Sequence, residues 1–184
     1  MANRWMLSFS AIVFSVLTAT PSFCWTLPDT GQHKCYDNSG EIPCPNPGED
    51  FYGQDAQYLG AEPAYQDNGD GTVTDLNTGL VWQKADDGVE RTWSAAIAYC
   101  EDLSLGGLTG WRLPELSELF SIADFGRYHP AINPVFDCRP SYYWSGTAGA
   151  GNSVFAWLVG FHRGHADWSY KSYTSYVRCV REGP

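Results

Sequence analysis

The alternation of apolar and polar residues predicts a β-hairpin near the start of the folded region. The turn-forming run Asp67–Gly71 is followed by the alternating segment Thr72–Asp75. A second turn, Asn77–Gly79, precedes the apolar segment Leu80–Trp82. Two short strand-forming segments that are bounded by such turns are typical of an antiparallel hairpin.

Two amphipathic helices are predicted after the hairpin. Within residues 92–103, apolar side chains recur at spacings of three and four, which places Cys100 on the buried face of a first helix. A second apolar stripe of this kind lies in residues 115–122, where Pro114 suits the first helical turn. The sequence therefore predicts two helices between the hairpin and residue 134, at residues 92–103 and 115–122.

The sequence after residue 134 favours strands. The aromatic and β-branched segments Tyr142–Ser145, Val154–Val159 and Tyr176–Val180 are separated by turns rich in Gly, Ser and Asn. A hairpin, two helices and then several strands predict an α+β domain, in which helices and strands are segregated along the chain. We place this domain at residues 65–184.

Two segments of different composition precede the domain. Residues 1–24 contain one charge, Arg4, and an uncharged apolar run that is too short to span a bilayer core of about 30 Å. They predict a cleaved secretory signal peptide, with cleavage after Ser22 and after Cys24 as open alternatives. Residues 25–64 are rich in Pro, Gly, Asp and Asn and predict an extended arm. No other segment is predicted to cross a membrane, so we expect an exported protein, periplasmic or extracellular.

The formal net charge of −10 is unevenly distributed. Residues 127–184 carry six basic and three acidic side chains, so the acidic excess lies before them. An overall negative field repels phosphate, which argues against nucleic acid as a partner. Charged residues make up only 17% of the chain and aromatic residues 15%, which argues against a disordered acidic tail and for a packed core.

Export favours disulfide bonds for the cysteines, because secretory compartments are oxidising. Cys35 and Cys44 enclose a short loop rich in turn residues and are predicted to pair locally, clipping the arm. The sequence assigns no partner to Cys138. Three alternatives stay open for it: a free buried thiol, a bond to a retained Cys24, or exchange into another pair.

Two segments contain residue types that bind metals, yet neither predicts a metal site. A calcium loop aligned on Gly71 would need an acidic residue where Gln66 stands, so a β-turn is favoured. His162, His165 and Asp167 are closely spaced, but their segment predicts a β-turn between two strands, where histidines more often lie on the surface. We expect no metal and no cofactor.

The segment Phe161–Tyr173 combines aromatic and basic side chains. Aromatic faces stack on sugar rings or apolar patches, and Arg and Lys pair with sulfate, carboxylate or phosphate. The alternative is that half of the aromatic side chains fill the core while the alternating half is exposed. The candidate ligand-binding residues are His162, Arg163, His165, Trp168, Tyr170, Lys171 and Tyr173.

Five short motifs occur in order along residues 65–182. They are Asp67–Asp75, Thr78–Trp82, Gly110–Pro114, Tyr143–Thr147 and Tyr176–Arg181. This set resembles the Lcl C-terminal domain family, which is named after the ligand-binding end of the Legionella collagen-like adhesin. The collagen-like repeats of that adhesin are absent here, and the arm stands in their place.

Two wider similarities imply one fold. The first-helix cysteine and the helix that follows it resemble the opening of C-type-lectin-like domains, and Arg112–Pro114 with Glu118 resembles a motif of the related formylglycine-generating enzymes. The resemblance implies a C-type-lectin-like domain with an N-terminal hairpin, two helices and a C-terminal antiparallel sheet, in which Cys100 bonds to Cys179. We expect Arg112 and Glu118 to form a structural ion pair that holds the second helix.

No active site is carried over by these similarities. A formylglycine-type oxidase needs two reactive thiols, and the candidates are Cys138 and Cys179, of which the second already has a structural partner. The sugar-binding triplets of calcium-dependent lectins do not occur. We expect an exported, non-enzymatic binding module for extracellular or cell-surface polysaccharide. The alternative is a structural or accessory domain that binds a protein partner, and the oligomeric state is left open.

Overall fold

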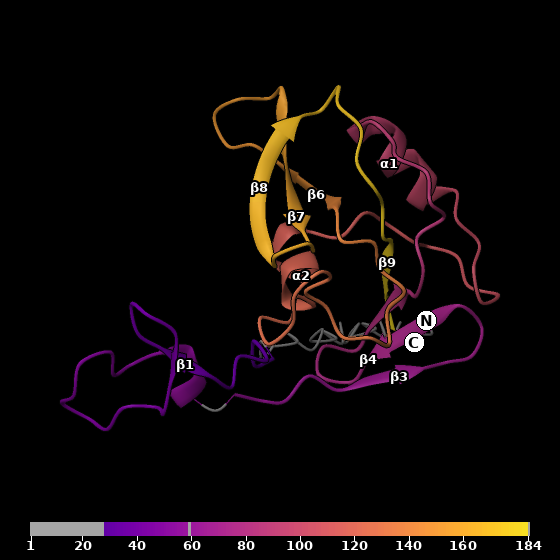
Figure 1. Cartoon of the computed structure of the whole chain (residues 1–184). Helices are drawn as coiled ribbons and strands as arrows, with labels where there is room; N and C mark the ends of the chain where they lie inside the picture. Colours follow the sequence, from indigo (N-terminus) through magenta and orange to yellow (C-terminus); the bar gives the residue numbers. More distant parts are fainter. Residues whose placement is uncertain (1–27, 59, 184) are drawn as a thin grey trace, which may run out of the picture.

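The computed structural model describes residues 28–58 and 60–183, and the predicted signal peptide, residues 1–24, lies outside them. The described residues form three antiparallel sheets and two α-helices, with a short 3₁₀ helix in the arm (Figure 1). In chain order the elements are β1 (Cys35–Tyr36), β2 (Glu41–Ile42), η1 (Asp55–Gln57), β3 (Tyr65–Asp67), β4 (Thr72–Asp75), β5 (Leu80–Gln83), α1 (Trp93–Glu101), α2 (Leu116–Ser121), β6 (Tyr142–Ala148), β7 (Phe155–Gly160), β8 (His165–Tyr170) and β9 (Val180–Glu182).

The predicted hairpin is present as β4 and β5, and it lies inside a four-stranded sheet with the order β3-β4-β5-β9. Trp82 on β5 is opposite Val73 on β4 and Val180 on β9, and all three side chains are buried. The last strand starts later than the predicted strand Tyr176–Val180, because Tyr176 bridges to β6 in the other sheet before the chain joins β5.

The second sheet, β6-β7-β8, has packed layers on both faces. Tyr143 and Val159 are opposite each other and point to the face covered by α2, which lies against all three strands. The next pair, Trp144 and Leu158, points to the other face, where it packs in a cluster that includes Cys100 of α1. The alternation of side chains along a strand thus supplies both hydrophobic cores of the domain.

Both predicted helices are present, and the mixture of helices with antiparallel sheets is the expected α+β architecture. The second helix begins later than predicted, at Leu116 instead of beside Pro114. Its start is set by a capping box, in which the backbone N–H of Glu115 donates to the Glu118 carboxylate at 2.7 Å. The capping box satisfies backbone donors that the first turn of a helix leaves unpaired.

The arm is anchored at its base and projects from the domain at its disulfide-bonded tip (Figure 1). Cys35 and Cys44 form the predicted disulfide. At the base, the N–H of Asp29 donates to the carbonyl of Ala61 at 2.7 Å, which holds the two ends of the arm together. The N–H of Phe125, in the loop after α2, donates to the carbonyl of the arm residue Thr30 at 2.7 Å.

Gly126→Ala is expected to detach the arm from the domain. An added Cβ at Gly126 would overlap the carbonyl oxygen of Gly31 in the arm, so one of the two backbones must move. The arm should be cleaved faster in limited proteolysis, while the domain keeps its thermal unfolding temperature. Gly40→Ala is the matched control, because a Cβ there meets no atom within 4 Å. Equal cleavage of both variants would contradict this account of the docking.

The long-range disulfide Cys100–Cys179 should stabilise the domain far more than the arm disulfide does. It joins residues 79 apart in sequence, so replacing both cysteines by Ala releases a long loop and should cost about 4 kcal/mol. The corresponding double substitution of Cys35 and Cys44, which are nine positions apart in sequence, opens only a short loop within the arm and should leave the main transition unchanged. Urea unfolding followed by tryptophan fluorescence measures both costs. Similar losses of unfolding free energy in the two double variants would contradict the larger contribution of the Cys100–Cys179 bond.

Candidate functional site

The structure divides the seven candidate ligand-binding residues between the two ends of β8. The strand advances about 3.3 Å per residue, so its ends are about 17 Å apart. His162, Arg163 and His165 lie at the β7–β8 turn, which we call the histidine end. The other four, Trp168, Tyr170, Lys171 and Tyr173, lie at the far end of β8 and in the turn that follows.

Four aromatic side chains share one face at that far end. Trp168 pairs with Trp157 across the β7–β8 ladder, and Tyr170 pairs with Phe155, so the four lie on one face of the sheet. The Phe155 ring contacts both Trp168 and Tyr170, with 4.5 Å between ring centroids in each case. Trp168 is nevertheless 54% exposed and Tyr170 47%.

Tyr173 extends this surface. Its ring centroid is 5.5 Å from that of Tyr170, and its side chain is 61% exposed. We call the set Phe155, Trp157, Trp168, Tyr170 and Tyr173 the aromatic strip. Phe155 and Trp157 were not among the residues predicted from the sequence, because the candidates were confined to the segment Phe161–Tyr173. The alternation within Val154–Val159, together with the hairpin pairing, is the signal that could have identified them.

A cavity of about 300 Å³ adjoins the aromatic strip. Its walls are Phe155, Trp157 and Trp168 on one side and Gly149, Ala150 and Asn152 from the β6–β7 loop on the other. None of these six side chains is charged. The cavity offers aromatic walls and one side-chain amide, a combination suited to a flat, largely uncharged ligand.

Lys171 points away from the aromatic strip. Its Nζ lies 4.0 Å from the centroid of the Trp93 ring at the start of α1, a cation–π contact. The backbone reinforces this placement, since the N–H of Trp93 donates to the carbonyl of Lys171 at 3.1 Å. The Lys171 charge therefore lies against α1 instead of beside Trp168 and Tyr170.

The histidine end is a packed cluster. The rings of Tyr142, His162 and His165 gather over Gly160, whose missing Cβ leaves them room. Ring centroids are 4.9 Å apart for His162 with Tyr142 and for His162 with His165. Burial lowers the pKa of His162, and the nearby His165 and Arg163 lower it further. Among residues 28–58 and 60–183, no three His, Cys, Asp or Glu side chains form a group that could hold a metal ion.

Arg112 and Glu118 form a two-pronged ion pair at the start of α2. The two guanidinium nitrogens donate to the two carboxylate oxygens at 2.6 and 2.7 Å. The Glu118 side chain is only 6% exposed, and Arg112 also donates to Glu182 on β9 at 2.9 Å. These hydrogen bonds raise the pKa of Arg112. The geometry ties α2 to the last strand.

Glu118→Ala should destabilise the domain by about 2–3 kcal/mol, because the change removes both arms of a largely buried pair together with the helix cap. Glu182→Ala is the matched control, since Glu182 bonds the same arginine but is 74% exposed. It should cost less than about 1 kcal/mol. Urea denaturation of the two variants gives both values. Equal costs would contradict a structural role for the buried pair.

Among the described residues, Cys138 and Cys179 are not bonded to each other. Cys179 is bonded to Cys100, as the resemblance implied. Cys138 is the one free cysteine among the described residues, and its side chain is half-buried. Burial raises the pKa of the Cys138 thiol, which disfavours the nucleophilic thiolate. Of the three alternatives for Cys138, exchange into another pair is not found among the described residues, and a bond to Cys24 lies outside them.

The sequence model of the Lcl C-terminal domain family matches residues 71–181. The chain belongs to the Lcl C-terminal domain family. The matched region contains both helices, the sheet β6-β7-β8 and the aromatic strip, whereas the arm lies outside it. Membership of this family indicates an adhesin-related module. The family and the two disulfides together indicate that the protein is exported. A search of curated proteins found no match. Within the described residues, no helix is long and apolar enough to cross a membrane.

Proposed function

We propose that this chain is an exported, non-enzymatic binding module that holds extracellular or cell-surface polysaccharide on the aromatic strip. The observation that carries the proposal is the exposure of Trp168, Tyr170 and Tyr173 on one continuous face beside an uncharged cavity. A folded domain rarely leaves such a patch open to water without a binding role. Sugar rings suit it, because their C–H faces stack on aromatic rings while their hydroxyls reach the Asn152 amide and the tyrosine hydroxyls.

The fold supports the same proposal. A first-helix cysteine bonded to the residue before the last strand is the arrangement that the resemblance to C-type-lectin-like domains implies. We propose on this basis that the domain belongs to that fold group. The proposed function itself depends on the aromatic strip, since a fold alone does not determine a ligand.

The charges around the aromatic strip favour a neutral sugar over an anionic one. Lys171 is held against Trp93 on the other side, and Arg163 lies at the histidine end. The cavity walls carry no charge. Stacking of uncharged rings is insensitive to salt, whereas binding of an anionic chain would weaken as the Debye length falls from about 10 Å at 0.1 M salt to about 3 Å at 1 M.

Trp168→Ala and Tyr170→Ala should each weaken glycan binding at least about tenfold, equivalent to about 1.4 kcal/mol. A glycan array with the purified chain identifies the ligand, and calorimetry measures the affinities at low and high salt. Tyr128→Ala is the matched control, because Tyr128 is 71% exposed but lies in the loop after α2. The affinity of the unaltered chain should be nearly the same at both salt concentrations.

Two results would overturn the proposal. The first is the absence of any retained glycan together with a stable complex with a protein, which would favour an accessory domain with a protein partner. The second is glycan binding that survives both aromatic substitutions. A steep loss with salt, together with weakening in Arg163→Ala and Lys171→Ala, would instead replace the neutral ligand by an anionic one.

A further inference from the structure

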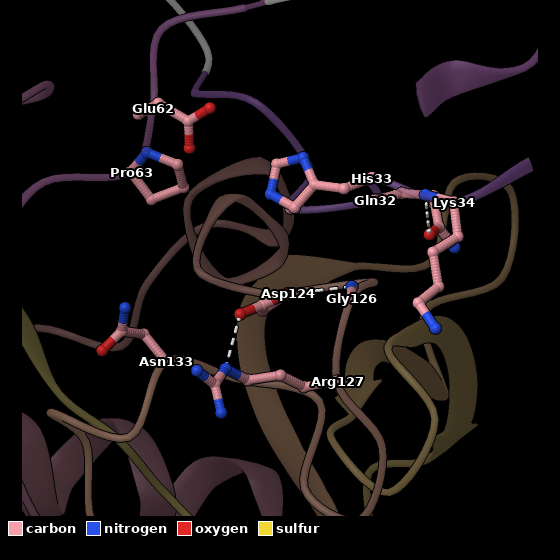
Figure 2. Close-up of a pocket in the computed structure, with 10 residues that line it drawn as sticks. Gln32, His33, Lys34, Glu62, Pro63, Asp124, Gly126, Arg127 and Asn133 are labelled. Carbon is pink, nitrogen blue, oxygen red and sulfur yellow. Dashed lines mark hydrogen bonds and ion pairs between the residues drawn. The ribbon is translucent and has the colours of Figure 1, made fainter. Parts of the chain in front are cut away.

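A polar cleft of about 400 Å³ lies between the base of the arm and the loops that follow α2 (Figure 2). His33 and Glu62 belong to its arm side, and Asp124, Arg127 and Asn133 to its domain side. The arm lies outside the matched region 71–181, so this cleft exists only because the arm docks on the domain. It is separate from the aromatic strip and shares no residue with it.

The domain side presents an oriented guanidinium. Arg127 Nε donates to Asp124 Oδ2 at 2.9 Å, while Asp124 Oδ1 accepts the backbone N–H of Gly126 at 2.9 Å. Asp124 is therefore occupied in holding Arg127. The two terminal Nη atoms have no hydrogen-bond partner among the described residues, and the guanidinium ends beside Asn133 in Figure 2. Asn133 accepts the N–H of Val135 through its side-chain oxygen, which leaves its amide nitrogen free to donate.

The arm side presents a carboxylate and an imidazole. The Glu62 side chain and the His33 ring make no hydrogen bond to other described residues, and both border the open space opposite Arg127 and Asn133 in Figure 2. Lys34 also lines the cleft, but its Nζ is paired with Glu41 at 2.7 Å. The unpaired groups around the cleft are thus one guanidinium, one carboxylate, one imidazole and one side-chain amide.

We infer that this cleft binds a small hydroxylated carboxylate, a compound of the sugar-acid class. The carboxylate pairs with the two free Nη atoms of Arg127, because a guanidinium binds a carboxylate through two parallel hydrogen bonds. Hydroxyl groups of the ligand donate to Glu62 and bond to His33 and Asn133. A cleft of this volume accommodates a ligand of monosaccharide size.

The unpaired anion distinguishes this ligand from simpler anions. Sulfate or phosphate would place its charge against Glu62 and would have no hydroxyl hydrogen to donate to it when fully ionised. A neutral sugar would satisfy Glu62 but leave the Arg127 guanidinium unpaired. A ligand with one carboxylate and several hydroxyls is the class that satisfies every free group around the cleft.

The test is a titration of the isotope-labelled full-length chain with D-glucuronate, followed by ¹H–¹⁵N NMR, with D-glucose as the matched neutral probe. We expect saturable shifts, in the millimolar range, of the amides of Gly31–Lys34, Gly126 and Arg127. D-glucose should leave these amides unshifted at the same concentrations. Equal shifts with both sugars, or no saturable shift with glucuronate, would overturn the inference.

Three variants locate the binding. Arg127→Gln keeps a side chain of similar shape but lacks the charge, and should weaken glucuronate binding at least about tenfold, since the charge-assisted pair is lost. Arg163→Gln, outside the cleft, should bind as the unaltered chain does, and so should Trp168→Ala. Gly126→Ala, which displaces the arm, should abolish the shifts. Undiminished binding to Arg127→Gln, or loss of binding in Trp168→Ala, would place the site elsewhere and refute the proposal.

Discussion

The stretch of chain from Ser175 to Glu182 joins the two sheets of the domain, and the other elements are arranged around it. Tyr176 bridges to β6, and Val180 pairs with β5 four residues later. Between them, Cys179 is bonded to α1, and the fully buried Arg178 donates through its two Nη nitrogens to carbonyls of the loops after β5 and before β6. A buried cation is costly unless its donors are satisfied, so these loops must close around it. The domain can therefore complete its core only when its last residues are in place.

The aromatic strip is exposed because β8 is an edge strand. The helix α2 lies against all three strands and the cluster around α1 covers the other face, but Trp168 and Tyr170 at the outer end of β8 stay about half exposed. The Phe155 ring, on the neighbouring strand, packs against the rings of Trp168 and Tyr170 and so restricts their positions. The arm cleft lies elsewhere and has the opposite character, since Arg127 and Glu62 line it. Of the two kinds of binding that we propose, the one on the aromatic strip depends on stacking, which salt hardly affects, and the one in the cleft depends on charge, which salt screens.

Much of the architecture could be predicted from local sequence. The hairpin of β4 and β5, the helix containing Cys100 and the strands β6 and β7 all follow from spacings within ten or so residues, because periodicity records which side of an element faces the core. The Cys35–Cys44 disulfide could also be predicted locally, because the two cysteines enclose a short loop rich in turn residues. The distant Cys100–Cys179 pair came from the resemblance to a fold, and the α2 start was misplaced because the capping role of Glu115 was not recognised.

The geometry of the candidate site could be predicted from the local sequence only in part. The sequence by itself determined that Phe161–Tyr173 is aromatic and basic and favours strands, and it left open whether only the alternating half of the aromatic side chains would be exposed. Only the tertiary structure decided that Lys171 rests on Trp93, that the histidines pack over Gly160, and that residues of β7 complete the aromatic strip. The physical reason is that a side chain's neighbours across a sheet or against a helix are set by strand register and by packing between distant segments, which the order of residues along one strand does not contain.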